Sequence, residues 1–108
     1  MIIKPLALLA GAQASETIHL QDGPHFTGIL FPDAWGGGLV TFEGGLVRSS
    51  PIYPVVDITG APIGIETVGQ AIHTLDPILL LGVPYFRLVW PTPLPADTTV
   101  SLIIREYA

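Results

Sequence analysis

Turn-forming residues recur about every ten residues along most of this chain, and this spacing leaves room only for short strands. Segments rich in Gly, Pro, Asp and Ser occupy positions 21–24, 36–38, 44–45, 49–51, 57–60, 76–77 and 91–97. The runs between them contain β-branched and aromatic residues, and no stretch free of Gly and Pro keeps a helical period. The pattern predicts an all-β fold, an antiparallel β-sandwich of jelly-roll-like type with about eight short strands.

Alternation of apolar and polar residues predicts which side chains point into the sandwich. The expected strands are 16–20, 25–31, 39–43, 52–57, 63–68, 71–75, 85–90 and 98–105. Two of them alternate clearly, so one set of side chains on each is expected to face inward: Phe86, Leu88 and Trp90, and Val100, Leu102 and Ile104. Val89 and Ile103 then fall on outer faces, which are ordinarily polar in a sandwich. Their position suggests that a partner covers the outside.

The segment 52–68 is expected to form a hairpin. Asp57 and Gly60 bracket a short turn between two apolar runs. Pro54 and Pro62 cannot donate ladder hydrogen bonds, which predicts that these strands lie at the edge of a sheet.

The first fourteen residues allow two structures. Lys4, an apolar stretch and Ala12-Gln13-Ala14 follow the layout of a secretory signal, but the apolar stretch is short and begins with Pro5. We therefore expect residues 1–14 to be an apolar first strand or an arm that lies on a neighbouring subunit. We expect the arm's contribution to be to association, with residues 15–108 forming the sandwich domain.

The low charge of the chain bears on its partners. Only 12% of the residues are charged and 49% are hydrophobic, whereas about a quarter of an ordinary domain is charged. Part of the surface is therefore expected to contact other protein chains. The net charge of -5, with four Lys and Arg, argues against nucleic acid, and no apolar run is long enough to cross a membrane.

No set of residues in the sequence specifies catalysis, a metal or a cofactor. His19, Asp22 and His25 could ligate zinc if strand pairing brought them together, but a polar hairpin gives the same spacing. His73 is expected to be an outward-facing polar residue without a fixed partner. The Ser residues lack a nucleophile-elbow motif, and the glycines at 36–38 are expected to be a flexible connection. We expect a protein that is not an enzyme and has no cofactor or metal.

The aromatic loop Phe31-Pro32-Asp33-Ala34-Trp35 has two interpretations. Exposed Trp and Phe side chains often anchor protein interfaces or stack on sugars. Trp35 could equally fold back over the core, because large aromatic side chains are buried on average.

Several segments together resemble a family of small virion-associated β-sandwich proteins of tailed bacteriophages. They are Thr27-Gly28-Ile29, Pro32-Asp33-Ala34-Trp35, Leu39-Val40-Thr41-Phe42, the run from Tyr53 to Gly60, Thr74-Leu75-Asp76-Pro77, Tyr85-Phe86-Arg87-Leu88 and Ala96-Asp97. The chain departs from the family at Glu43-Gly44-Gly45, where such proteins usually have a turn resembling Ser-x-Asp-Gly.

This resemblance implies a non-enzymatic structural protein of the virion, and we expect a capsid decoration or cement protein on the capsid surface. Its expected partners are the major capsid protein and further copies of itself, as a homotrimer, with neither nucleic acid nor membrane. The alternative is a tail, neck or fibre component that binds host carbohydrate through aromatic loops. The residues expected at interfaces are Ile2, Ile3, Leu6, Leu8, Leu9, Phe31, Pro32 and Trp35.

Overall fold

All regular elements in the described part of the chain are β-strands. The computed structural model describes residues 2–19, 24–47, 52–74 and 83–106. The strands are β1 (Ile2–Leu8), β2 (Ile18–His19), β3 (Pro24–Phe31), β4 (Gly38–Gly45), β5 (Tyr53–Pro54), β6 (Gly64–Thr67), β7 (Ala71–Thr74), β8 (Tyr85–Val89) and β9 (Thr98–Glu106). Within these ranges no helix is long and apolar enough to cross a bilayer.

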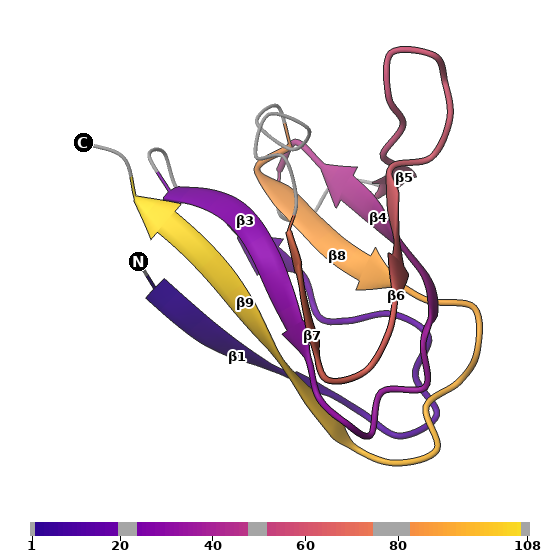
Figure 1. The fold of residues 1–108 in the computed structure, drawn as a ribbon. Helices are drawn as coiled ribbons and strands as arrows, with labels where there is room; N and C mark the ends of the chain where they lie inside the picture. Colours follow the sequence, from indigo (N-terminus) through magenta and orange to yellow (C-terminus); the bar gives the residue numbers. More distant parts are fainter. Residues whose placement is uncertain (1, 20–23, 48–51, 75–82, 107–108) are drawn as a thin grey trace.

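The strands form two antiparallel sheets that pack face to face (Figure 1). The first sheet has the order β1-β9-β3-β7. The second has the order β2-β8-β4-β5, and β6 also pairs with β4. β5 and β6 therefore act as one interrupted strand beside β4, joined by a hairpin that projects from the sandwich.

The strand order is that of a jelly roll. With β5 and β6 counted as one strand, β1 pairs with β9, β2 with β8, β3 with β7, and β4 with β5 and β6. These nested antiparallel pairs are the pairs of one long hairpin that is folded into two sheets. This folding places most successive strands in opposite sheets and yields two four-stranded sheets. The predicted antiparallel, jelly-roll-like sandwich is confirmed.

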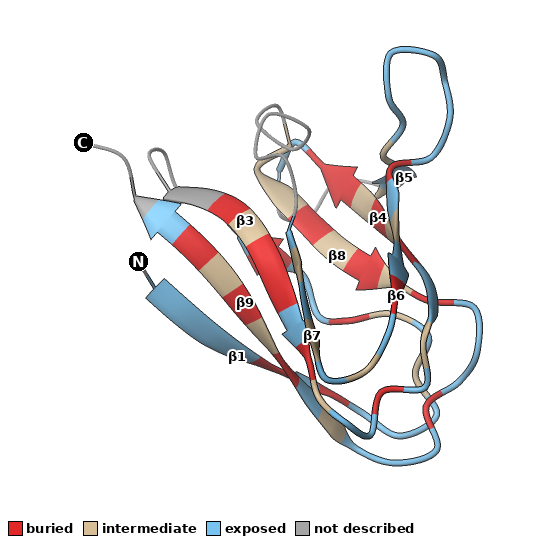
Figure 2. Cartoon of the chain, viewed as in Figure 1, coloured by how far each residue is buried: buried red, intermediate tan, exposed pale blue. Residues whose placement is uncertain are grey.

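The inward faces expected from alternation are confirmed on the two clearest strands. Phe86, Leu88 and Trp90 are buried, as are Val100, Leu102 and Ile104, and Figure 2 shows buried residues alternating with more exposed ones along β8 and β9. The expected edge position of Pro54 is also confirmed, because β5 ends the second sheet. Leu20 and Leu75, the last residues of two expected strands, lie outside the described residues.

Of the two structures allowed for the amino terminus, the first strand is the one observed. β1 pairs with β9 along its whole length, from Ile2 opposite Ile104 to Leu8 opposite Thr98. Leu6 and Leu8 are fully buried in the core, so the segment belongs to the sandwich. A division between residues 14 and 15 has no structural counterpart, because Ala14 forms a bridge to Val89 and Ser15 bonds to Leu88.

The core contains two aromatic clusters. Phe26, Phe42 and Phe86 contact one another with ring centroids 5.3 to 6.2 Å apart. The second cluster contains Phe31, Trp35 and Trp90. Because Phe26 and Phe31 are five residues apart on β3, the clusters lie about 16 Å from each other along the strand. Aromatic packing therefore anchors both ends of the sandwich.

Candidate interaction surfaces

The outer face of the first sheet is uncharged and mostly apolar across all four strands. One row of neighbours contains Ile3, Ile103, Gly28 and Thr74, and the next contains Pro5, Ser101, Leu30 and Ile72. Ala7 and Thr99 extend the surface toward one end of β1 and β9. We call these ten residues the apolar outer face. None of them is charged, and Arg105 borders the face at the other end of β9.

The outer face of the second sheet is polar, as is usual for a solvated sheet. Glu43 on β4 faces Arg87 on β8, and the Arg87 guanidinium donates two hydrogen bonds to one carboxylate oxygen at 2.6 and 2.8 Å. His19 stacks on Tyr85 at 4.3 Å, and Glu66 is exposed beside Leu39. Val89 lies within this polar face. Of the two apolar residues expected on outer faces, Ile103 therefore lies on an apolar surface and Val89 does not.

The β1 edge of the first sheet is protected against pairing with another strand. β1 ends this sheet, and Pro5 in its middle has no N–H to offer. Lys4 lies opposite the buried Leu102, on the inner side of the sheet, where its charge opposes the approach of a further strand. Addition of a further strand is therefore disfavoured at the β1 edge of this sheet.

Trp35 belongs to the core, which settles the question that its loop left open. The loop turns back through a hydrogen bond from the Trp35 N–H to the Pro32 carbonyl at 3.0 Å, and the side chain is only 5% exposed. Its indole N–H donates to Thr67 Oγ1 at 2.8 Å, and Thr67 in turn donates to the Gly38 carbonyl at 2.6 Å. A buried hydroxyl thus links the loop to the start of β4.

The glycines before β4 make this arrangement possible. Gly37 and Gly38 have φ of 85° and 107°, values that other residues rarely adopt. These φ values bring the Gly38 carbonyl to Thr67, so the segment that was expected only to connect two strands also takes part in the contact with Trp35.

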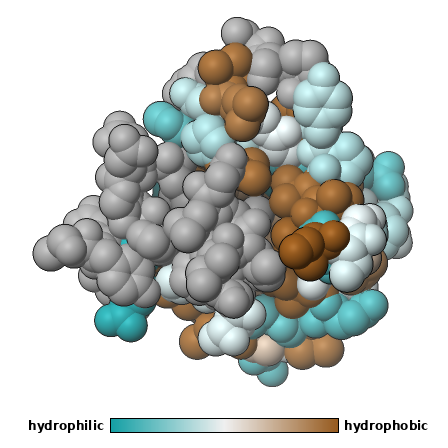
Figure 3. Space-filling view, turned by 90° about the horizontal axis from the view of Figure 1, so that it is seen from above, coloured by the Kyte–Doolittle hydropathy of each residue, from teal (hydrophilic) through white to brown (hydrophobic). Residues whose placement is uncertain are grey.

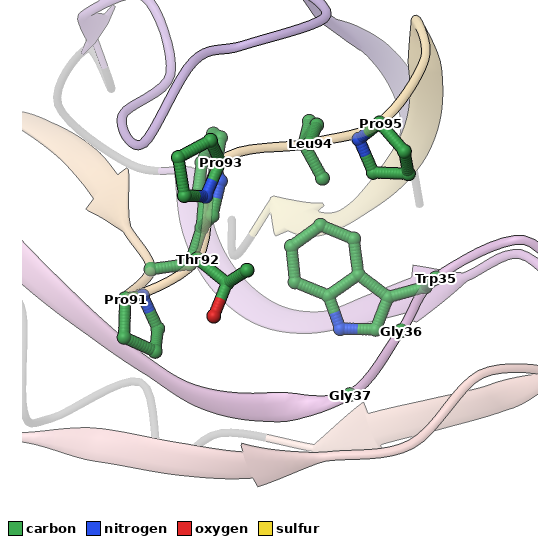
Figure 4. A pocket seen from close by; sticks show the side chains of 9 residues that line it. Trp35, Gly36, Gly37, Pro91, Thr92, Pro93, Leu94 and Pro95 are labelled. Atoms are coloured by element: carbon green, nitrogen blue, oxygen red, sulfur yellow. The ribbon is translucent and has the colours of Figure 1, made fainter.

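A small cavity lies beside the Trp35 ring. Its volume is about 140 Å³, and in Figure 4 the Trp35 indole and the segment from Pro91 to Pro95 face each other across it. Cavities that enclose small molecules usually measure at least about 300 Å³. Because the Trp35 side chain is only 5% exposed and the cavity is small, Trp35 does not offer an open platform for a sugar.

Replacing Thr67 with Val is expected to lower the free energy of unfolding by about 2 kcal/mol. The change leaves the buried indole N–H of Trp35 without its acceptor, and an unsatisfied buried donor costs about 1 to 3 kcal/mol. The exposed Gly38 also loses the hydrogen bond to its carbonyl. Urea unfolding of both proteins measures the difference. Thr74→Val, at an exposed position on β7, is the matched control, and equal losses in the two variants would contradict the assignment.

The structure divides the residues expected at interfaces into two groups. Leu6, Leu8, Phe31 and Trp35 are buried in the chain's own core, so the expectation that they contact a partner is wrong. Their apolar character serves folding. Ile2, Ile3 and Leu9 are exposed and Pro32 is partly exposed. Of these, Ile3 belongs to the apolar outer face.

The histidines take positions that differ from the expected ones. His19 is on β2 of the second sheet and His25 is on β3 of the first, so strand pairing does not join them, and Asp22 lies outside the described residues. His73 is not a free outward-facing residue, because it pairs with the buried Ile29 and its Nε2 lies 3.1 Å from the Val68 amide nitrogen. The described residues contain no group of three or more potential metal ligands.

Comparisons with protein-family models, with curated proteins and with solved structures found no match to this chain. The functional argument therefore depends on the surfaces described above.

Proposed function

We propose that the chain is a non-enzymatic structural protein of a tailed-phage virion, a decoration or cement protein that binds the capsid surface. The observation that carries this proposal is the contrast between the two sheets. One has an uncharged apolar outer face, and the other has a charged, solvated one. This asymmetry supports the proposal, because a decoration protein has one side covered by the particle and the other in water.

The geometry also supports contact with a partner of defined shape. The apolar outer face lies on a sheet whose open β1 edge is blocked by Lys4 and Pro5, so the partner meets a preformed surface. An uncharged contact area also avoids bringing the net charge of -5 against other acidic surfaces. The major capsid protein is the proposed partner, and self-association, with the trimer expected from the sequence, belongs to the same proposal.

The copy number of the chain in purified phage particles tests this function. Quantitative mass spectrometry against the major capsid protein is expected to give hundreds of copies per particle. A few or a dozen copies would instead assign the chain to the neck or tail, and its absence from particles would overturn the virion role.

A charge on the apolar outer face is expected to prevent particle binding. Ile72→Lys places a charge at a 61% exposed position of this face, and the bound copies should fall at least tenfold. The reason is that burying an isoleucine contributes about 1.5 to 3 kcal/mol and each 1.4 kcal/mol is a factor of ten. The control is Leu39→Lys, at an exposed position of the second sheet. If both variants bind particles like the parent, the face is not the contact.

A further inference from the structure

The hairpin between β5 and β6 projects from the sandwich and is ordered by its own backbone. We call residues 55–63 the tip hairpin. The Ile63 N–H donates to the Val55 carbonyl at 3.0 Å, and the Asp57 N–H donates to the Ala61 carbonyl at 2.8 Å. A bridge joins Val56 and Pro62 between these bonds. Every residue from 56 to 62 is exposed, so the rest of the chain holds this ladder only at its base, where Ile63 is buried and the Val55 N–H donates to the Phe42 carbonyl at 2.9 Å.

Asp57 fixes the turn at the end of the tip hairpin. Its Oδ1 accepts hydrogen bonds from the Thr59 N–H at 2.8 Å, the Thr59 hydroxyl at 2.7 Å and the Ala61 N–H at 3.1 Å. The hydrogen bonds from Thr59 hold the pKa of the Asp57 carboxyl below its ordinary value, so the carboxylate is ionised at neutral pH. Gly60 supplies the φ of 86° that the turn requires. The turn is therefore preorganised.

The preorganised tip presents apolar side chains to solvent. Ile58 is completely exposed and Val56 is about half exposed. The Asp57 carboxylate is negatively charged, and its Oδ1 accepts hydrogen bonds from its own turn. Holding Ile58 in water contributes nothing to the stability of the isolated chain. A rigid apolar tip does favour binding, because its conformational entropy is already lost before contact.

An apolar cavity lies at the base of the same hairpin. Its volume is about 520 Å³, within the range of cavities that enclose a ligand. The described residues that line it are Gly44, Gly45, Leu46, Val47, Tyr53, Pro54, Val55 and Val83. None of them is charged, and the exposed Ile58 of the same chain does not fill the cavity. Figure 3, which views the molecule from the end where the hairpin projects, shows hydrophobic side chains on this surface.

We propose that the tip hairpin inserts Ile58 into this cavity of a second copy of the chain. The described lining of the cavity is apolar and uncharged, so the one charged residue of the tip hairpin, Asp57, meets no charge of like sign there, although each copy has a net charge of -5. Tip and cavity are different surfaces of one chain, and a closed oligomer fills every cavity with a neighbour's tip. The inference rests on the self-association in the proposed function and is independent of the contact with the capsid.

The first test compares two variants of the full chain by sedimentation velocity at micromolar concentration. The parent is expected to form a defined oligomer, and Ile58→Ser should weaken association at least tenfold, since the buried isoleucine contributes about 1.5 to 3 kcal/mol. The melting temperature of the monomer should not change, because Ile58 is fully exposed within its own chain. Val68→Ser, at a 59% exposed position outside both surfaces, is the matched control and should associate like the parent.

The second test places the tip next to the cavity directly. The chain has no Cys, so an Ile58→Cys protein mixed with a tagged Leu46→Cys protein can form a mixed disulfide only between copies. Leu46 lines the cavity and is exposed, and this pair should cross-link at least tenfold faster than Ile58→Cys mixed with a tagged Val68→Cys protein. A monomeric parent, an Ile58→Ser protein that associates normally, or equal cross-linking rates would overturn the inference. Each of these outcomes leaves the particle-binding test of the apolar outer face unaffected.

Discussion

Trp90→Ala is expected to lower the free energy of unfolding by about 3 to 5 kcal/mol, which is the range for removing a large aromatic side chain from a core. The ring is only 4% exposed and meets Trp35 edge to face at 5.8 Å between centroids. Its indole N–H also donates to the Ala12 carbonyl at 2.8 Å. The truncation therefore removes apolar contact, an aromatic pair and a hydrogen-bond donor at one position.

Thermal unfolding followed by circular dichroism measures the effect of Trp90→Ala. For a domain of about this size, the expected loss lowers the melting temperature by more than about 10 °C. Trp90→Phe keeps a ring but not the N–H, so its loss should be smaller. Tyr53→Ala removes an exposed aromatic side chain and is the control. A Trp90→Ala protein as stable as the control would show that this aromatic cluster does not hold the end of the sandwich together.

The parts of the fold that were predictable from sequence are those set by local pattern. Alternation along 85–90 and 98–105 identified the buried sides of β8 and β9, because side chains on a strand point to opposite faces in turn. Turn residues located the hairpin at Asp57 and Gly60, because such residues set the backbone conformation of only a few neighbouring residues. Neither inference required knowledge of which strands pair.

The parts that sequence did not reveal depend on pairing between distant segments. Ile103 indicated a covered outer face, but only the register places Ile3 beside it and aligns Leu30 with Ile72 in the next row. His19 and His25 are close in sequence and nevertheless enter opposite sheets. The burial of Trp35 depends on Thr67, thirty-two positions later, so the loop sequence was compatible with both core and interface.

The structure of the amino terminus also depends on pairing with a distant segment, which the sequence did not reveal. This pairing gives the prediction with the largest expected effect. The apolar character of residues 1–14, and the Ser15 and Glu16 that follow them, made the segment look separable from the sandwich. Its register with β9 instead buries Leu6 and Leu8 completely.

Deleting residues 1–8 is therefore expected to abolish cooperative folding. Losing a buried leucine costs about 2 to 5 kcal/mol, so losing two approaches the 5 to 15 kcal/mol that stabilises a whole domain. The deletion also uncovers the β9 backbone along the length of β1, which leaves its hydrogen-bonding groups open to solvent and to other chains. Thermal melting and binding of a hydrophobic dye measure the outcome, and the truncated chain should show dye binding without a sharp transition.

Ile3→Ser tests whether any change in β1 destabilises the protein, or only the loss of its buried leucines. The side chain is exposed on the outer face of β1, so its replacement should change the free energy of unfolding by less than about 0.5 kcal/mol. Leu6→Ala, on the inner face of the same strand, should cost about 2 to 5 kcal/mol. A truncated chain that melts cooperatively near the parent's temperature would mean that the sandwich is complete without β1 and that the segment acts as an arm for association. In the expected outcome, Ile3→Ser changes the stability little and Leu6→Ala lowers it strongly, because the two side chains lie on opposite faces of β1.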